Sequence, residues 1–84
     1  MVPNKSNLSK LENILSKVGF KIRYEKGNFK SGFCLLNKNK IVILNKYISI
    51  PNQFEILKNL FQNNNISKDN LSEEEILFLK KLNL

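Results

Sequence analysis

The stretch FKIRYEKGNFKSGFCLLNKNKIVILN, residues 20–45, decides the fold because the spacing of the apolar residues changes there from helical to strand-like. At its start Phe20, Ile22 and Tyr24 alternate with charged residues, which is typical of a strand that buries one face. The alternation ends at the turn residues 26–28, where a glycine adopts a positive φ at little steric cost. This pattern predicts a first strand with one apolar and one polar face.

Two further strands are predicted in the same stretch, over residues 30–36 and 40–45, with a polar turn at 37–39 between them. Both carry consecutive apolar residues, FCLL and IVIL, which indicates burial on both faces or a more central place in the sheet than that of the first strand. Because short turns join the three segments, we expect a three-stranded antiparallel meander.

The chain before this stretch predicts a helix with one apolar side. The apolar stripe consists of Leu8, Leu11, Ile14, Leu15 and Val18. Ser6 or Ser9 is the expected N-cap, and Ser9 with Glu12 has the spacing of a capping box. Gly19 predicts the end of the helix, because glycine readily takes the left-handed conformation that terminates helices.

Two more helices are predicted after the strands. Ser49 and Pro51 mark the start of the first, which ends in the polar residues 62–65. Ser72 and Glu75 have the capping-box spacing and mark the start of the second. The expected architecture is therefore an α+β fold with an N-terminal helix, a three-stranded antiparallel meander and two C-terminal helices.

The length and composition exclude several classes of protein. With 84 residues, the chain is expected to form a single small domain over residues 1–84. One cysteine and no histidine exclude an internal disulfide, the usual zinc fingers, and HExxH or Cys-His catalytic sites. Cys34 lies among apolar residues of a predicted strand, so we expect a buried side chain rather than a nucleophile. We expect no catalytic residue, no metal and no cofactor, and hence no enzyme.

No stretch has the pattern of a signal peptide or the apolar length of a membrane span. The expected location is the cytoplasm, without membrane contact.

Residues 19–61, about half of the chain, resemble a group of short, uncharacterised bacterial proteins. The shared pattern is a charged strand, then GNF, a small residue, glycine, an aromatic residue and cysteine, then a V/I-rich strand, Asn-Lys and a helix. It is similar more distantly to the front part of ImmA/IrrE-type zinc metallopeptidases, in which a V/I-rich strand ending in Asn precedes the metal-binding helix. The corresponding helix here, PNQFEILKNLF (residues 51–61), has no HExxH, so the resemblance implies a scaffold without the metal site.

The net charge of +7 suggests a polyanionic partner such as nucleic acid. Thirteen of the fourteen cationic residues are lysines, however, and asparagine and isoleucine are abundant, as an AT-rich coding sequence also produces. The positive charge therefore has two open explanations, selection for binding and codon bias. The candidate nucleic-acid-binding residues lie on the predicted strand and hairpin face: Lys21, Arg23, Tyr24, Lys26, Phe29 and Lys30.

Our first hypothesis for function is a small non-catalytic binding or adaptor domain that acts through protein-protein contacts, with a protein partner or a larger assembly. It rests on the lack of catalytic side chains and on apolar positions of the last two helices that exceed the needs of so small a core. RNA or DNA binding through the basic strand and hairpin face is the alternative. The oligomeric state is left open.

Overall fold

The computed structural model describes residues 2–27, 32–36, 39–64 and 66–84, with residues 32–36 and 39 described by their backbone. They form α1 (Lys5–Lys17), β1 (Phe20–Glu25), β2 (Gly32–Leu36), β3 (Asn39–Asn45), α2 (Ile50–Asn63) and α3 (Glu73–Lys81). The class is α+β, with three helices among the described residues. Parts of the predicted turns and of the predicted second strand, at residues 28–31, 37–38 and 65, lie outside them.

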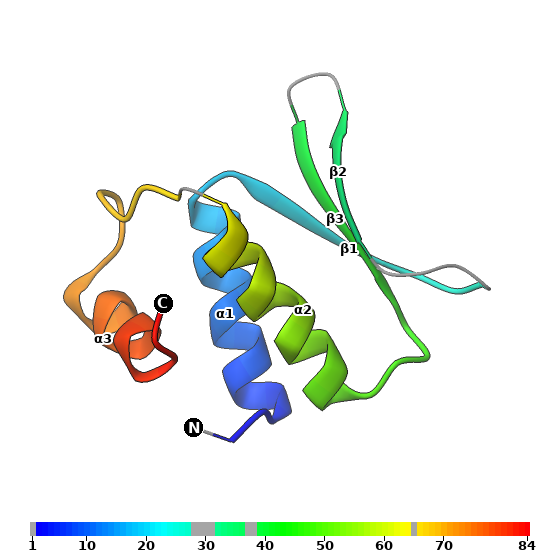
Figure 1. Cartoon of the computed structure of the whole chain (residues 1–84), viewed down its shortest axis with the longest axis horizontal. Coiled ribbons are helices and arrows are strands. Elements are labelled where there is room, and N and C mark those ends of the chain that lie inside the picture. Colours follow the sequence, from blue (N-terminus) through cyan, green and yellow to red (C-terminus); the bar gives the residue numbers. More distant parts are fainter. Residues whose placement is uncertain (1, 28–31, 37–38, 65) are drawn as a thin grey trace.

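The predicted antiparallel meander is wrong. β1 lies beside β3 and runs parallel to it, with Phe20 opposite Lys40 and Glu25 opposite Asn45. β2 pairs with the other side of β3 in the antiparallel direction, so the strand order is β1-β3-β2 (Figure 1). The chain therefore goes from one edge of the sheet to the other between Glu25 and Gly32. Two strand spacings amount to about 10 Å, and a connection of this length spans them easily.

One face of the sheet is covered by helices. Phe20, Val42 and Leu44 are buried on that face, because the parallel register places the side chains of paired residues on the same side. On the opposite face Lys21 and Arg23 of β1 are exposed. The prediction that the strand at 40–45 is central is confirmed, whereas β2 is an edge strand.

The three helices lie to one side of the sheet. α1 and α2 lie side by side against it, and α3 lies next to α1 on the side away from the strands (Figure 1). One apolar cluster joins all three helices to the sheet, and its members with no exposed area include Leu11 and Leu15 of α1, Leu44 of β3, Leu57 of α2 and Leu79 of α3.

The predicted start of α1 is wrong, and its predicted end is confirmed. The N-cap is Asn4, whose Oδ1 accepts a hydrogen bond from the backbone N–H of Asn7 at 2.8 Å, so the predicted capping by Ser6 or by the Ser9 and Glu12 pair is wrong. The predicted stop at Gly19 is confirmed, because α1 ends at Lys17 and Gly19 has a φ of 101°.

The caps of the other helices agree with the sequence. Ser49 caps α2 by accepting from the N–H of Asn52, and a proline follows in the first turn. Ser72 and Glu75 form the predicted capping box of α3, in which the Ser72 N–H donates to Glu75 Oε1 at 2.9 Å and the Glu75 N–H donates to Ser72 Oγ at 3.2 Å. These caps fix where α2 and α3 begin.

Candidate functional site

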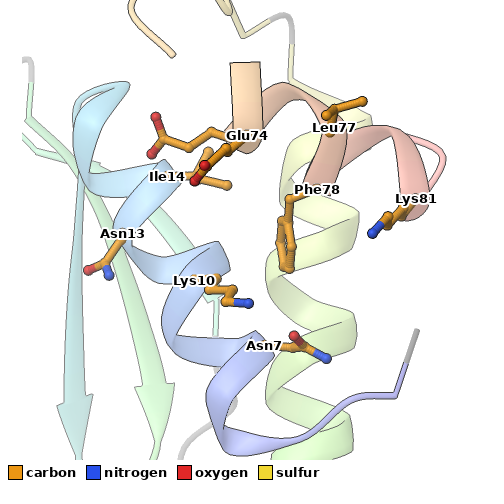
Figure 2. Close-up of a pocket in the computed structure, with 9 residues that line it drawn as sticks. Asn7, Lys10, Asn13, Ile14, Glu74, Leu77, Phe78 and Lys81 are labelled. Carbon is orange, nitrogen blue, oxygen red and sulfur yellow. The ribbon is translucent and has the colours of Figure 1, made fainter. Parts of the chain in front are cut away.

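A groove of about 520 Å³ lies between α1 and α3 (Figure 2). Its lining consists of Asn7, Lys10, Asn13 and Ile14 from α1 and of Glu74, Glu75, Leu77, Phe78 and Lys81 from α3. The volume lies within the range of pockets that bind small ligands or a few side chains of a partner. Leu79 is the one buried residue of α3, while Ile76 and Phe78 are partly buried against the apolar cluster.

The floor and one wall of the groove are apolar. Ile14 is buried beneath it and the ring of Phe78 is half-buried, while Leu77 is 57% exposed. Consecutive residues of an α-helix are turned by about 100°, so a helix that directs Leu79 into the core cannot also bury Leu77. A large apolar side chain is thus left facing solvent beside an aromatic ring.

The polar rim of the groove carries charges of both signs. The Nζ atom of Lys10 lies 6.0 Å from the centre of the Phe78 ring, at the outer limit of a cation-π contact. Figure 2 shows Lys10 and Lys81 on either side of that ring, with Glu74 near the other end of the groove. An apolar floor with a mixed polar rim is the composition expected of a protein-binding site.

Glu75 closes the groove at the start of α3. Its pKa is lowered first by the hydrogen bond from the Ser72 backbone N–H and then by the ammonium group of Lys17. The Lys17 Nζ atom lies 2.9 Å from Glu75 Oε2 and so links the end of α1 to the start of α3. This carboxylate therefore takes part in attaching α3 to α1.

The structure places Lys21 and Arg23 on one face of β1 and Tyr24 on the other, although the sequence analysis assigned all three to one nucleic-acid-binding face. Lys21 and Arg23 are exposed on the face of β1 away from the helices, where Arg23 Nη2 donates to Glu25 Oε1 at 3.0 Å. Tyr24 directly follows Arg23 in the strand and so faces the other side of the sheet. Tyr24 therefore does not share a face with these two cations.

The remaining predicted residues of that face fall at and beyond the end of β1. Lys26 directly follows the strand and is exposed. Phe29 and Lys30 lie outside the described residues.

Metal ligands do not gather in the part of the chain that the structure describes, where no three histidine, cysteine, aspartate or glutamate side chains lie close enough to hold an ion. Within the same part, none of the helices has both the length and the apolar character needed to cross a membrane. Cys34 lies in β2 opposite Ile41 of β3.

Comparisons with known proteins found no matching family model, no matching curated protein and no matching solved structure. The resemblance of residues 19–61 to short bacterial proteins therefore stays an expectation from the sequence.

The groove residues were not identified individually from the sequence, although one signal was present. The run ILFL at positions 76–79 places four apolar residues in succession on a helix, and a helix that packs on one side cannot bury all four. The sequence thus indicated excess apolar surface on this helix. It could not indicate that α1 supplies the facing wall, because that depends on how the two helices pack.

Proposed function

We propose that the chain is a small non-catalytic binding domain that acts through protein-protein contacts, with the groove between α1 and α3 as its binding surface. The observation that carries this proposal is Leu77, which is 57% exposed on a well-capped helix beside the half-buried ring of Phe78. Covering both side chains with apolar groups of a partner removes apolar area from water and favours association.

The shape of the groove favours a short helical or extended segment as the bound part of the partner. Its two walls are stretches of α1 and α3, and an apolar side chain of the partner fits between Ile14, Leu77 and Phe78. Helix-in-groove recognition uses a few apolar anchors of this kind, with polar residues around them. The side chains of Lys10, Lys81 and Glu74 then supply polar contacts at the rim.

The proposal is tested by recovering partners from cell lysate with three forms of the tagged protein: the parent chain, Leu77→Lys and Val2→Lys. Val2 is the matched control because it is a large apolar residue that is 67% exposed and lies outside the groove. Nuclease treatment and high salt remove partners held through nucleic acid or bulk charge.

Proteins that the parent chain and Val2→Lys retain after both treatments, and that Leu77→Lys loses, are the expected result. Equal recovery by all three forms, or no protein partner for any of them, would contradict the proposal. Circular dichroism of the three forms checks that each is folded.

The alternative function, RNA or DNA binding through the basic strand and hairpin face, has less support at the place the sequence predicted. Lys21 and Arg23 are exposed there, which favours it, but Glu25 pairs with Arg23, and Tyr24 faces the other side. The test compares the affinity of two variants. In the first, this face is neutralised at Lys21, Arg23, Lys26 and Lys30, and in the second the neutralised residues are Lys58, Lys80 and Lys81. A loss of affinity that is equal in both sets indicates bulk charge only.

A further inference from the structure

Two segments that are far apart in the sequence are joined at the end of the sheet where β1 and β3 finish. Because these strands are parallel, their carboxyl ends lie at the same end of the sheet, and residues 25–27 come to lie beside residues 45–47. The backbone N–H of Lys46 donates to the carbonyl oxygen of Glu25 at 2.9 Å, which continues the parallel pairing past the strand ends. In an antiparallel meander β2 would have lain between these two segments.

The side chain of Asn45 holds both segments. Its Nδ2 group donates to the carbonyl oxygen of Gly27 at 2.9 Å, and its Oδ1 atom accepts from the backbone N–H of Tyr47 at 3.0 Å. Asn45 is only 8% exposed, so these hydrogen bonds are partly shielded from competing water. The two segments are thereby fixed relative to each other by one buried amide.

The joined segments present two cations and one aromatic ring to solvent. Lys26 and Lys46 are exposed and follow directly on the paired residues Glu25 and Asn45. Tyr47 is 73% exposed, the largest exposed fraction among the large apolar and aromatic residues that the structure describes. A tyrosine ring normally contributes to stability by burial, and this one makes no such contribution to the core. Glu25, the acidic residue that directly precedes Lys26, is paired with Arg23.

We propose that this strand-end cluster, defined as Lys26, Lys46 and Tyr47 around Asn45, binds single-stranded nucleic acid. Tyr47 stacks on a base, and Lys26 and Lys46 neutralise phosphates of the same strand. The site is independent of the groove between α1 and α3 and adds a second binding activity to the function proposed above. It also differs from the site predicted from the sequence, since it uses Lys46 and Tyr47 in place of Tyr24 and the exposed face of β1.

The experiment measures the fluorescence anisotropy of labelled oligouridylate and oligothymidylate at several salt concentrations. The variants are Lys26→Gln with Lys46→Gln, Tyr47→Leu, and Tyr47→Phe. The matched control is Lys5→Gln with Lys80→Gln, which removes the same charge from two exposed lysines of α1 and α3. Circular dichroism confirms that each variant is folded, and the charge-neutral Leu77→Gln tests independence from the groove.

The expected result has three parts. Tyr47→Leu weakens binding on the order of tenfold, while Tyr47→Phe keeps most of it, because stacking needs the ring and not the hydroxyl. Replacing Lys26 and Lys46 lowers affinity more than replacing Lys5 and Lys80, and it reduces the salt slope of the binding constant by about 1.4, the value for two phosphate contacts on a single strand. Leu77→Gln leaves the affinity unchanged.

Three outcomes would overturn the proposal: no binding of either oligonucleotide by the parent chain, equal losses for the two lysine pairs, or equal affinity of the Tyr47→Leu and Tyr47→Phe forms. Equal losses for the lysine pairs would leave the net charge of +7 as the sole basis of any binding. None of these outcomes bears on the groove, whose own test uses protein partners.

Discussion

Lys17 Nζ lies 2.9 Å from Glu75 Oε2, and this ion pair joins the last turn of α1 to the first turn of α3. It closes one end of the groove in which Leu77 is exposed. The same carboxylate accepts the Ser72 N–H in the capping box, so a single side chain fixes both the start of α3 and its attachment to α1. Glu75 therefore connects the two helices that form the groove.

We predict that Glu75→Gln makes the stability of the protein less dependent on pH under acidic conditions. The pKa of Glu75 is lower in the folded than in the unfolded chain, chiefly through the Ser72 backbone hydrogen bond and then through Lys17. A carboxylate of this kind stabilises the fold above its unfolded pKa, and the stabilisation is lost as the pH falls through the folded pKa. Urea denaturation of both forms across the acidic range measures the difference. Identical pH profiles would contradict the prediction.

Glu12 is expected to affect the pH dependence of stability in the opposite direction to Glu75. Burial raises the pKa of Glu12 above its ordinary value, so the folded state disfavours the charged form. Stability is therefore lost as the pH rises through the interval between the ordinary and the raised pKa. We expect Glu12→Gln to raise the thermal midpoint at neutral pH and to have little effect well below the ordinary pKa. A lowered midpoint at neutral pH would show that the charged form is favoured instead.

Gly19→Ala is predicted to destabilise the protein through backbone strain alone. Gly19 has a φ of 101°, and a Cβ atom added there meets nothing within 4 Å, so steric contact with other residues does not contribute. The left-handed region costs a residue with a side chain about 1–2 kcal/mol. Urea denaturation measures the loss, with Ser16→Ala as the control because Ser16 is an exposed residue of α1. An unchanged free energy of unfolding for Gly19→Ala would mean that the chain turns differently after α1.

Asn45→Ala tests the amide that joins the two strand ends. The substitution leaves the Gly27 carbonyl and the Tyr47 N–H without the partners that Asn45 provides, and we expect a loss of about 1–3 kcal/mol in the free energy of unfolding. Asn59→Ala is the control, since Asn59 is an exposed residue of α2 where alanine favours the helix. Equal stabilities of the two variants would contradict the role given to Asn45.

Two leucines of α3 are predicted to differ strongly in their effect on stability. Leu79 has no exposed area, so Leu79→Ala should cost about 2–5 kcal/mol. Leu77→Ala should change stability by less than about 0.5 kcal/mol, because the side chain faces solvent. Chemical denaturation of both variants checks this contrast. A large loss for Leu77→Ala would identify Leu77 as a core residue and remove the main support for the groove as a binding site.

Local signals in the sequence predicted the helix boundaries well. Ser49, Ser72 and Gly19 were each identified from short-range chemistry, since a cap depends on the few residues next to it. The start of α1 was missed because several small polar residues precede the apolar stripe, and Asn4 competes with Ser6 and Ser9 for the role of N-cap. Which of these residues is the N-cap depends on where the first turn of α1 begins, and the identity of the capping residue alone does not determine that.

The strand pairing could not be predicted in the same way. A period of two shows which face of a strand is buried but does not show which strand lies beside it. Short turns favour the nearest neighbour along the chain, and this preference holds for β2 and β3 but not for β1. Asn45, which makes the long-range hydrogen bond to Gly27, looks in the sequence like an ordinary turn residue. The strand-end cluster was missed for the same reason, since it forms only when β1 and β3 are neighbours.

The strand order also bears on how the sheet assembles during folding. Leu36 pairs with Asn39 across a short connection, whereas Phe20 pairs with Lys40, 20 positions later, so the hairpin of β2 and β3 closes a much smaller loop than the pair of β1 and β3. Smaller loops close faster and at a lower entropic cost. We therefore expect the two later strands to form first and the earliest strand of the chain to be added last, so that the sheet is built in the reverse of the order in which its strands are synthesised.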